Sequence, residues 1–304
     1  MNKHDAIKEI FRLAKENKGE KVDELKKTIL PPSLYKYRRL DDYTIESLYR
    51  KSIWLSNYKE LNDPFESLMK YDLEKHLIEY FLETDFESDF SRNYGVSLSE
   101  EDLKLIRNSR EPYNVYYDLC EQKSLPTFKK PTKSQLRENI VKLFEKYREY
   151  SYLGCFSEIN DSLLMWSHYA DNGKGICVEY CLNNIDISYL FPVFYSYEMY
   201  EFSIKDLHTL VRNLIKAKDW EYEQEWRIVY LTDKMKQNNH YVKIPTPTRI
   251  FLGPRFDENA SGSIDALAKI AGDLKVPIFK TQLSSKEYKI VVHSQLENIS
   301  KSST

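Results

Sequence analysis

The sequence of 304 residues lacks the marks of a membrane, secreted or zinc-binding protein. Its longest apolar runs have the length of a strand, as at Ile290–Val292, whereas a transmembrane helix needs roughly 20 apolar residues. The start of the chain carries charges throughout and has no apolar core of a secretory signal. The four cysteines, Cys120, Cys155, Cys177 and Cys181, show no CxxC spacing, so we expect free thiols in a reducing cytoplasm.

Excess charge and the common catalytic motifs are also missing. With 45 basic and 47 acidic residues, the net charge of -2 predicts neither nucleic-acid nor membrane binding. It does not exclude a local basic groove. The six histidines are scattered singly, and no GxSxG, HExxH, GxxxxGK[ST] or GxGxxG pattern occurs. We therefore expect no metal and no Walker-type nucleotide site. A content of 41% hydrophobic and 14% aromatic residues nevertheless indicates a folded, globular chain.

The spacing of apolar residues predicts an α+β fold with a mainly antiparallel sheet, which can be split, and surrounding helices. Residues 1–30 form an N-terminal helical segment with a break near Gly19, and residues 31–295 form one domain. Within it, three polar helices near 71–90, 98–108 and 133–149 form a helical insertion over about 71–150. Residues 296–304 are predicted to be a disordered tail. Strands are expected at 34–40, 52–57, 152–157, 175–182, 190–196, 225–231, 240–244, 248–253, 276–280 and 289–293, and further helices at 162–170, 202–218 and 258–273.

The motif YEQEWR places Glu223 and Glu225 one residue apart at the start of a predicted strand. Side chains at this spacing share one face of a strand. Two neighbouring carboxylates repel, which raises the pKa of one of them and suits a general base or an acceptor for a sugar hydroxyl. The alternative is structural, with Glu225 and Arg227 simply pairing with neighbours.

The motif NDPFE contains Asn62, Asp63 and Pro64, which predict a tight Asx turn. We expect Phe65 to enter the core and the charge of Glu66 to be free of any role in the turn. Two interpretations stay open: a turn that positions the second strand, or a loop that lines a cleft, where Asn62 or Asp63 contacts a ribose or a base.

The motif MWSHYA has the spacing of a packing helix, with Met165 and Tyr169 on one face and Trp166 on the next. His168 lies on neither apolar pair, so it either faces a cleft, where it orients a carboxylate or contacts a phosphate, or is an ordinary structural histidine. Lys174, between two glycines, is placed to approach a phosphate.

Five motifs in order carry a family resemblance: LYKYRRL, SIWLSNYKELNDPFES, CFSEINDSLLMWSHYADNGKGICVEY, KAKDWEYEQEWRIVY and IFLGPRF. The chain resembles the bacterial domain of unknown function 2971 over roughly residues 33–292, apart from much of the helical block. That resemblance implies no activity, because the family is named for lacking one.

The Glu-x-Glu pair is also similar to the signature of ADP-ribosyltransferases, and this second resemblance implies NAD as substrate. It assigns Glu225 to the stabilisation of the oxocarbenium-like centre and Glu223 to the substrate side. It also places Arg38 of the first strand on the dinucleotide and Ser56 of the second strand at the nicotinamide ribose. Tyr37, Trp54 or Trp166 are expected to stack on a ring. The expected site comprises Glu223, Glu225 and His168 as catalytic residues, and Tyr37, Arg38, Ser56, Asn62, Asp63, Trp166 and Tyr169 as contacts to NAD.

Three functional hypotheses follow. The first is an NAD-dependent ADP-ribosyltransferase that modifies RNA, DNA or protein, by association a bacterial defence or toxin effector with an antitoxin or defence partner. The second is a nuclease-like or phosphodiesterase-like hydrolase that uses His168 with Glu66 or Glu225. The third is a non-enzymatic sensor or partner-binding module of a defence system, whose 24 tyrosines serve recognition. An enzyme should bring Glu225, Arg38 and His168 around one pocket.

Overall fold

The structure, a computed structural model, describes residues 1–83, 98–124, 130–182, 186–203, 210–232, 240–257 and 263–296. The chain divides into two compact units, each described by itself. The first unit comprises Met1–Ser67, Glu149–Glu198 and Leu210–Thr304, and the second comprises Leu68–Arg148 and Met199–Thr209. The predicted boundaries of one domain over 31–295 stay a prediction, and residues 297–304 of the predicted tail lie outside the described residues.

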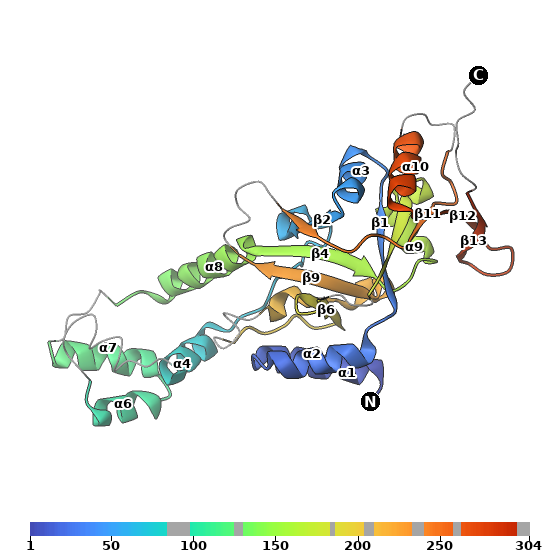
Figure 1. Cartoon of the computed structure of the whole chain (residues 1–304). Helices are drawn as coiled ribbons and strands as arrows, with labels where there is room; N and C mark the ends of the chain where they lie inside the picture. Colours follow the sequence, from blue (N-terminus) through green and yellow to red (C-terminus); the bar gives the residue numbers. More distant parts are fainter. Residues whose placement is uncertain are drawn as a thin grey trace, which may run out of the picture. The chain divides into compact units, whose positions relative to one another are not determined.

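A nine-stranded sheet forms the centre of the first unit, and with its surrounding helices it confirms the predicted α+β fold. The strand order is β13-β12-β11-β5-β1-β4-β9-β6, with β3 also paired to β4. The pair β11–β12 is parallel and the other pairs are antiparallel; β4 and β9 lie side by side as long arrows in Figure 1. The strands are β1 (Ser33–Arg38), β3 (Ser56–Asn57), β4 (Ser151–Ser157), β5 (Ile176–Cys181), β6 (Leu190–Pro192), β9 (Glu225–Leu231), β11 (Arg249–Leu252), β12 (Ile278–Leu283) and β13 (Ile290–Gln295).

The sheet opens between β1 and β4. Six residue pairs join β1 to β5, but the register of β1 with β4 holds only the pair Tyr35 with Ser157. Beyond this pair, the described residues of β1 and β4 are not joined by further ladder pairs, and β4 pairs with β3 instead at Leu153 and Tyr152.

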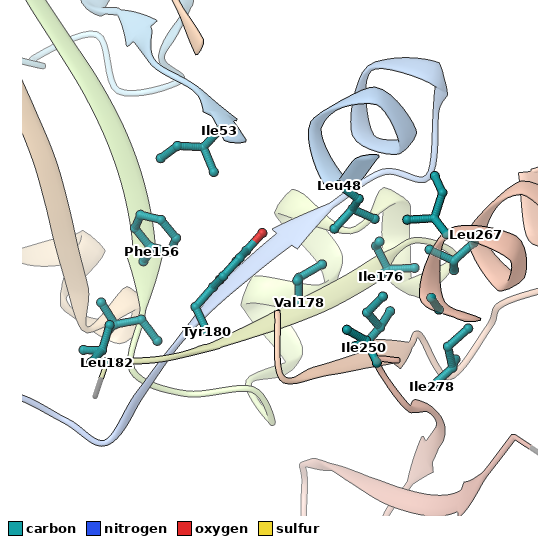
Figure 2. Close-up of a cluster of buried hydrophobic side chains, with 14 of the residues drawn as sticks. Leu48, Ile53, Phe156, Ile176, Val178, Tyr180, Leu182, Ile250, Leu267 and Ile278 are labelled. Carbon is teal, nitrogen blue, oxygen red and sulfur yellow. The ribbon is translucent and has the colours of Figure 1, made fainter. Parts of the chain in front are cut away.

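One face of the sheet is covered by the helices α3 (Asp42–Tyr49) and α10 (Ser263–Leu274). Alternate residues of β5, such as Ile176 and Val178, point to this face and meet Leu48 of α3 and Leu267 of α10 (Figure 2). The small antiparallel pair of β2 (Ser52–Trp54) and β10 (Tyr241–Lys243) adds Ile53 to the same core.

Two separate groups of helices cover the opposite face. The predicted N-terminal segment forms α1 (Lys3–Lys15) and α2 (Gly19–Ile29), which pack against Leu153 and Val229 of the strands β4 and β9. The short helix α9 (Leu163–Tyr169) instead packs on Tyr37 of β1 and on Phe251 of β11. The polar residues Glu225 and Arg227 of β9 are buried.

The second unit is helical around its own apolar cluster, with α4 (Leu73–Glu83), α6 (Glu100–Arg107), α7 (Pro112–Gln122) and α8 (Lys133–Glu149). Figure 1 shows α4, α6 and α7 gathered together. No helix was predicted between residues 108 and 133, yet α7 lies there. Its Pro112 occupies the first turn of the helix, where the missing N–H is not needed.

The helix predicted over 202–218 is wrong in the part that the structure describes. Residues Val211–Asn213 form a single 3₁₀ turn, and Ile215–Ala217 form β8, which pairs in parallel with β7 (Phe194–Ser196). Strand pairing thus overrides the local propensity of this segment, while residues 204–209 lie outside the described residues. Within the described ranges, no helix is long and apolar enough to cross a membrane.

Replacing Leu267 by alanine should destabilise the first unit by about 2–5 kcal/mol, because the side chain is fully buried between α10 and the sheet and leaves a cavity. The free energy of unfolding in urea measures the effect. Leu283→Ala is the matched control, because that leucine is 63% exposed and its removal should change stability by less than about 0.5 kcal/mol. Equal losses in both variants would contradict the described core.

Candidate functional site

A fully buried arginine, Arg227, joins two of the sequence motifs. Its Nη1 and Nη2 donate to the two carboxylate oxygens of Glu66 at 2.6 and 2.9 Å. Its Nε and Nη2 donate to the two oxygens of Glu225 at 2.8 and 3.0 Å. Nη1 also donates to the carbonyl oxygen of Asn213 at 2.8 Å. The guanidinium thus ties the NDPFE loop to β9 through the Glu66 carboxylate, which is buried against it.

Lys216 on β8 extends this network to the second glutamate of the YEQEWR motif. Its Nζ donates to Glu223 Oε2 at 2.6 Å and to Glu225 Oε2 at 3.2 Å. Burial alone would lower the pKa of Lys216, but the two carboxylates raise it above its ordinary value. Burial would raise the pKa of Glu225, yet the charges of Arg227 and Lys216 hold it far below its ordinary value. For Glu223, burial prevails and raises the pKa.

The third motif joins through Tyr169 of α9. The Tyr169 hydroxyl donates to Glu223 Oε1 at 2.5 Å and accepts from Asn62 Nδ2 at 2.8 Å. Polar residues of NDPFE, MWSHYA and YEQEWR therefore form one continuous network, which runs through Asn62, Tyr169, Glu223, Lys216, Glu225, Arg227 and Glu66.

Local backbone geometry explains how two glutamates reach the same lysine. The strand β9 begins at Glu225, as predicted, but Glu223 ends the 3₁₀ turn η5 (Lys218–Glu223), so strand alternation does not relate the two side chains. Gln224 between them adopts a left-handed conformation with φ of 44°. This turn, rather than strand alternation, brings both carboxylates to Lys216.

The NDPFE loop is the predicted Asx turn, since the Asp63 side chain accepts from the backbone N–H of Phe65 at 2.8 Å. Phe65 is 58% exposed, so its predicted place in the core is wrong. The turn points Glu66 inward to Arg227, and Phe65 beside it is left outside.

A cavity of about 270 Å³ lies against this network. Its walls come from Tyr35–Tyr37 of β1, from β4, from the segment 54–62 and from α9. It therefore occupies the opening between β1 and β4. Four carboxylates (Glu60, Glu66, Glu223 and Glu225) and three cationic side chains (Lys36, Lys216 and Arg227) line it, which leaves one negative charge in excess when all are ionised.

Six of the ten predicted site residues line this cavity: Tyr37, Ser56, Asn62, Tyr169, Glu223 and Glu225. Trp54, the additional stacking candidate, lines it too. The other four predicted residues, Arg38, Asp63, Trp166 and His168, do not, so the convergence of Glu225, Arg38 and His168 that was expected of an enzyme is not found around this cavity.

Each of these four has another place in the structure. The charge of Arg38 interacts with Tyr180, Asp41 and Tyr241, and its burial lowers its pKa. Asp63 holds the Asx turn. Trp166 is buried, donates to the carbonyl oxygen of Asn160 at 2.8 Å and packs edge-on against the Tyr37 ring. His168 is exposed, with its Nδ1 2.9 Å from the Tyr222 hydroxyl.

Two lysines of the cavity were missed by the sequence analysis. Lys216 and Lys36 lie in short strands without any motif that singles out an amine. The available signal was the alternation of polar and apolar residues in KYR and IKA, which places a lysine on one face of a strand. This alternation does not show whether the lysine faces a pocket or the solvent.

The DNGKG and FLGPR motifs have a structural role beside α9. The Gly253 N–H donates to the Gly175 carbonyl oxygen and the Arg255 N–H to that of Gly173, both at 2.9 Å. A Cβ on Gly253 would lie 2.1 Å from the Gly173 oxygen, so only glycine permits this approach. Lys174 is exposed and does not line the cavity, so its predicted approach to a phosphate stays a prediction.

Residues 165–228 match the model of a protein family of unknown function, DUF2971, which confirms the first family resemblance. The matched segment runs from α9 into β9 and holds the MWSHYA and YEQEWR motifs. No curated protein and no solved structure matches the chain. The resemblance to ADP-ribosyltransferases therefore stays a prediction.

Replacing Arg227 by methionine should cost about 3–5 kcal/mol of unfolding free energy, because it removes the buried cation that pairs with both Glu66 and Glu225. Adding Glu66→Gln and Glu225→Gln to this variant should recover part of the loss. Arg12→Met is the control, since its pairs with Glu9 and Glu16 are exposed and should matter little. A loss no larger than the control's would contradict the network.

Replacing Tyr169 by phenylalanine should raise the pKa of Glu223 further, because the Tyr169 hydrogen bond stabilises the ionised carboxylate. Carbon-13 NMR of protein labelled at glutamate carboxyls gives the titration, and the spectrum of Glu223→Gln identifies the signal. An unchanged or lowered pKa would show that this hydrogen bond does not act on Glu223.

Proposed function

We propose that the cavity binds the nicotinamide ribose half of NAD and that the protein is an ADP-ribosyltransferase-like enzyme. The observation that carries the proposal is the excess of carboxylates around a cavity set in an opening of the sheet. The nicotinamide ring of NAD is cationic, and the ribose becomes oxocarbenium-like as nicotinamide leaves. With its groups ionised, the lining carries one negative charge in excess, which favours both.

The size of the cavity supports half of the dinucleotide rather than the whole. At about 270 Å³ it is slightly smaller than the roughly 300–1,000 Å³ of pockets that enclose drug-sized ligands. Trp54 and Tyr37 offer ring faces or edges, and Ser56 and Asn62 offer hydrogen bonds to a ribose or a carboxamide.

The geometry favours an exchange of the roles that the sequence resemblance assigned to the two glutamates. Both oxygens of Glu225 are held by Arg227, and one of them by Lys216 as well, so this carboxylate anchors the network. Each oxygen of Glu223 has one partner, Tyr169 or Lys216, and keeps capacity for a ribose hydroxyl. We therefore assign Glu223 to the developing positive charge and Glu225 to its positioning.

The reaction breaks the bond between the ribose C1′ and nicotinamide and joins C1′ to a nucleophile of the acceptor. Nicotinamide leaves with the bonding electron pair as a neutral molecule, and the acceptor loses a proton. In this proposal the acceptor belongs to RNA, DNA or protein. A role in bacterial defence or as a toxin is proposed only because it is associated with such enzymes.

The hydrolase hypothesis receives less support, because it needs His168 beside Glu66 or Glu225. Those two carboxylates are engaged by Arg227, whereas His168 meets Tyr222 and does not line the cavity. The sensor hypothesis differs from the proposed enzyme in its outcome: a binding module takes up a ligand without turning it over.

The test mixes the protein with NAD labelled in its adenylate part and with total cell RNA, DNA and protein. Label transfer and nicotinamide release are measured. Glu223→Gln should lower the rate by roughly 10²–10³-fold, since it removes the charge that stabilises the transition state. Glu221→Gln is the matched control because its carboxylate is exposed and pairs with Lys218, and it should keep full activity.

If the unmodified protein neither transfers label nor consumes NAD, the proposal is refuted. A Glu223→Gln variant with an unchanged rate would also refute it. Tight binding of NAD without turnover would favour the sensor hypothesis instead.

A further inference from the structure

Lys36 is the one amine of the cavity that the proposed function leaves without a role. It lies in the middle of β1, half-buried, at the opening between β1 and β4. Its Nζ donates to the carbonyl oxygen of Cys155 at 2.8 Å and lies 5.1 Å from the centre of the Phe156 ring. Among the described residues, no carboxylate forms an ion pair with it.

The two lysines that are buried in the described part of the chain are both paired. Lys26 forms an ion pair with Asp23 at 2.7 Å, and Lys216 pairs with Glu223 and Glu225. Lys216 lines the same cavity as Lys36 and is its counterpart, more deeply buried and held by two carboxylates.

The charges around Lys36 determine its protonation. Burial lowers the pKa of its amine to about 8, and Arg38 on the same strand adds to this effect. Cys155 and Glu225 act in the opposite direction, but more weakly. With a pKa of about 8, roughly a quarter of the amine is unprotonated at pH 7.5, against about one part in a thousand for an ordinary lysine.

We propose that Lys36 is a nucleophilic amine and that the cavity forms an imine with small aldehydes, including the open-chain form of a reducing sugar. The ligand class follows from the site: a partly desolvated amine that donates to a backbone carbonyl, without a carboxylate partner, in a cavity open to small molecules.

The chemistry needs no further reactant. The nitrogen lone pair of Lys36 attacks the aldehyde carbon, and the carbonyl oxygen becomes a hydroxyl. The nitrogen then loses its second proton as the hydroxyl leaves as water, which yields the imine. The overall balance is one amine and one aldehyde to one imine and one water, and the step is reversible.

The proposal does not depend on NAD. An unreactive Lys36 would leave the proposed ADP-ribosyl transfer unaffected. A protein that does not consume NAD but has a reactive Lys36 would leave the imine proposal unaffected.

The experiment treats the full chain with propanal and sodium cyanoborohydride at pH 7.5, so that any imine is reduced to a stable propyl amine. Mass spectrometry of peptides follows each lysine with time. Lys36 should be modified at least about tenfold faster than Lys216 and the exposed Lys174, even though a lower pKa also weakens the nucleophile. Its rate should rise with pH around a midpoint near 8.

Arg38→Met provides a second readout in a chain that keeps Lys36. Loss of the neighbouring charge should move the midpoint of modification to higher pH and slow the reaction at pH 7.5. Modification of Lys36 no faster than that of Lys216 or Lys174 would overturn the proposal. A midpoint unmoved by Arg38→Met would do the same.

Discussion

A single buried guanidinium determines the arrangement of the site. Arg227 has no exposure, and its ion pairs with Glu66 and Glu225 join a loop near residue 62 to a strand more than 150 residues later. A charge in such a place is costly unless it is fully paired. The loop, the strand and the neighbouring lysine must therefore adopt these positions together, and the cavity beside them follows from that requirement.

This constraint separates two kinds of residue in the same motif. Glu225 and Arg227 neutralise each other in the interior, where their oxygens and nitrogens are engaged. Glu223 lies one left-handed residue away, at the cavity wall, with hydrogen bonds from Tyr169 and Lys216. The ion pair of Glu225 and Arg227 is rigid, and the neighbouring Glu223 can still accept a hydrogen bond from a ligand. This combination suits a preorganised site, because the ion pair holds Glu223 in place without competing for the ligand.

Much of the fold and of the polar network could be predicted from the sequence. Period-two patterns located most strands, and the motifs NDPFE, MWSHYA and YEQEWR held most of the residues of the network. The parts that could not be predicted depend on long-range contacts. Phe65 is apolar but exposed because Glu66 takes the inward position, and Ile215–Ala217 is a strand only because β7 lies beside it. Arg38 and Lys36 lie two residues apart on one strand, and their spacing does not predict that Lys36 lines the cavity while Arg38 does not.

The central claim is that the carboxylate-rich cavity holds the nicotinamide ribose of NAD against Glu223. A crystal structure of the Glu223→Gln variant with NAD tests this directly, because the variant should bind the dinucleotide without consuming it. We expect the nicotinamide ribose between β1 and β4, with a hydroxyl within hydrogen-bond distance of residue 223. An empty cavity at saturating NAD, or a dinucleotide bound elsewhere on the protein, would contradict it.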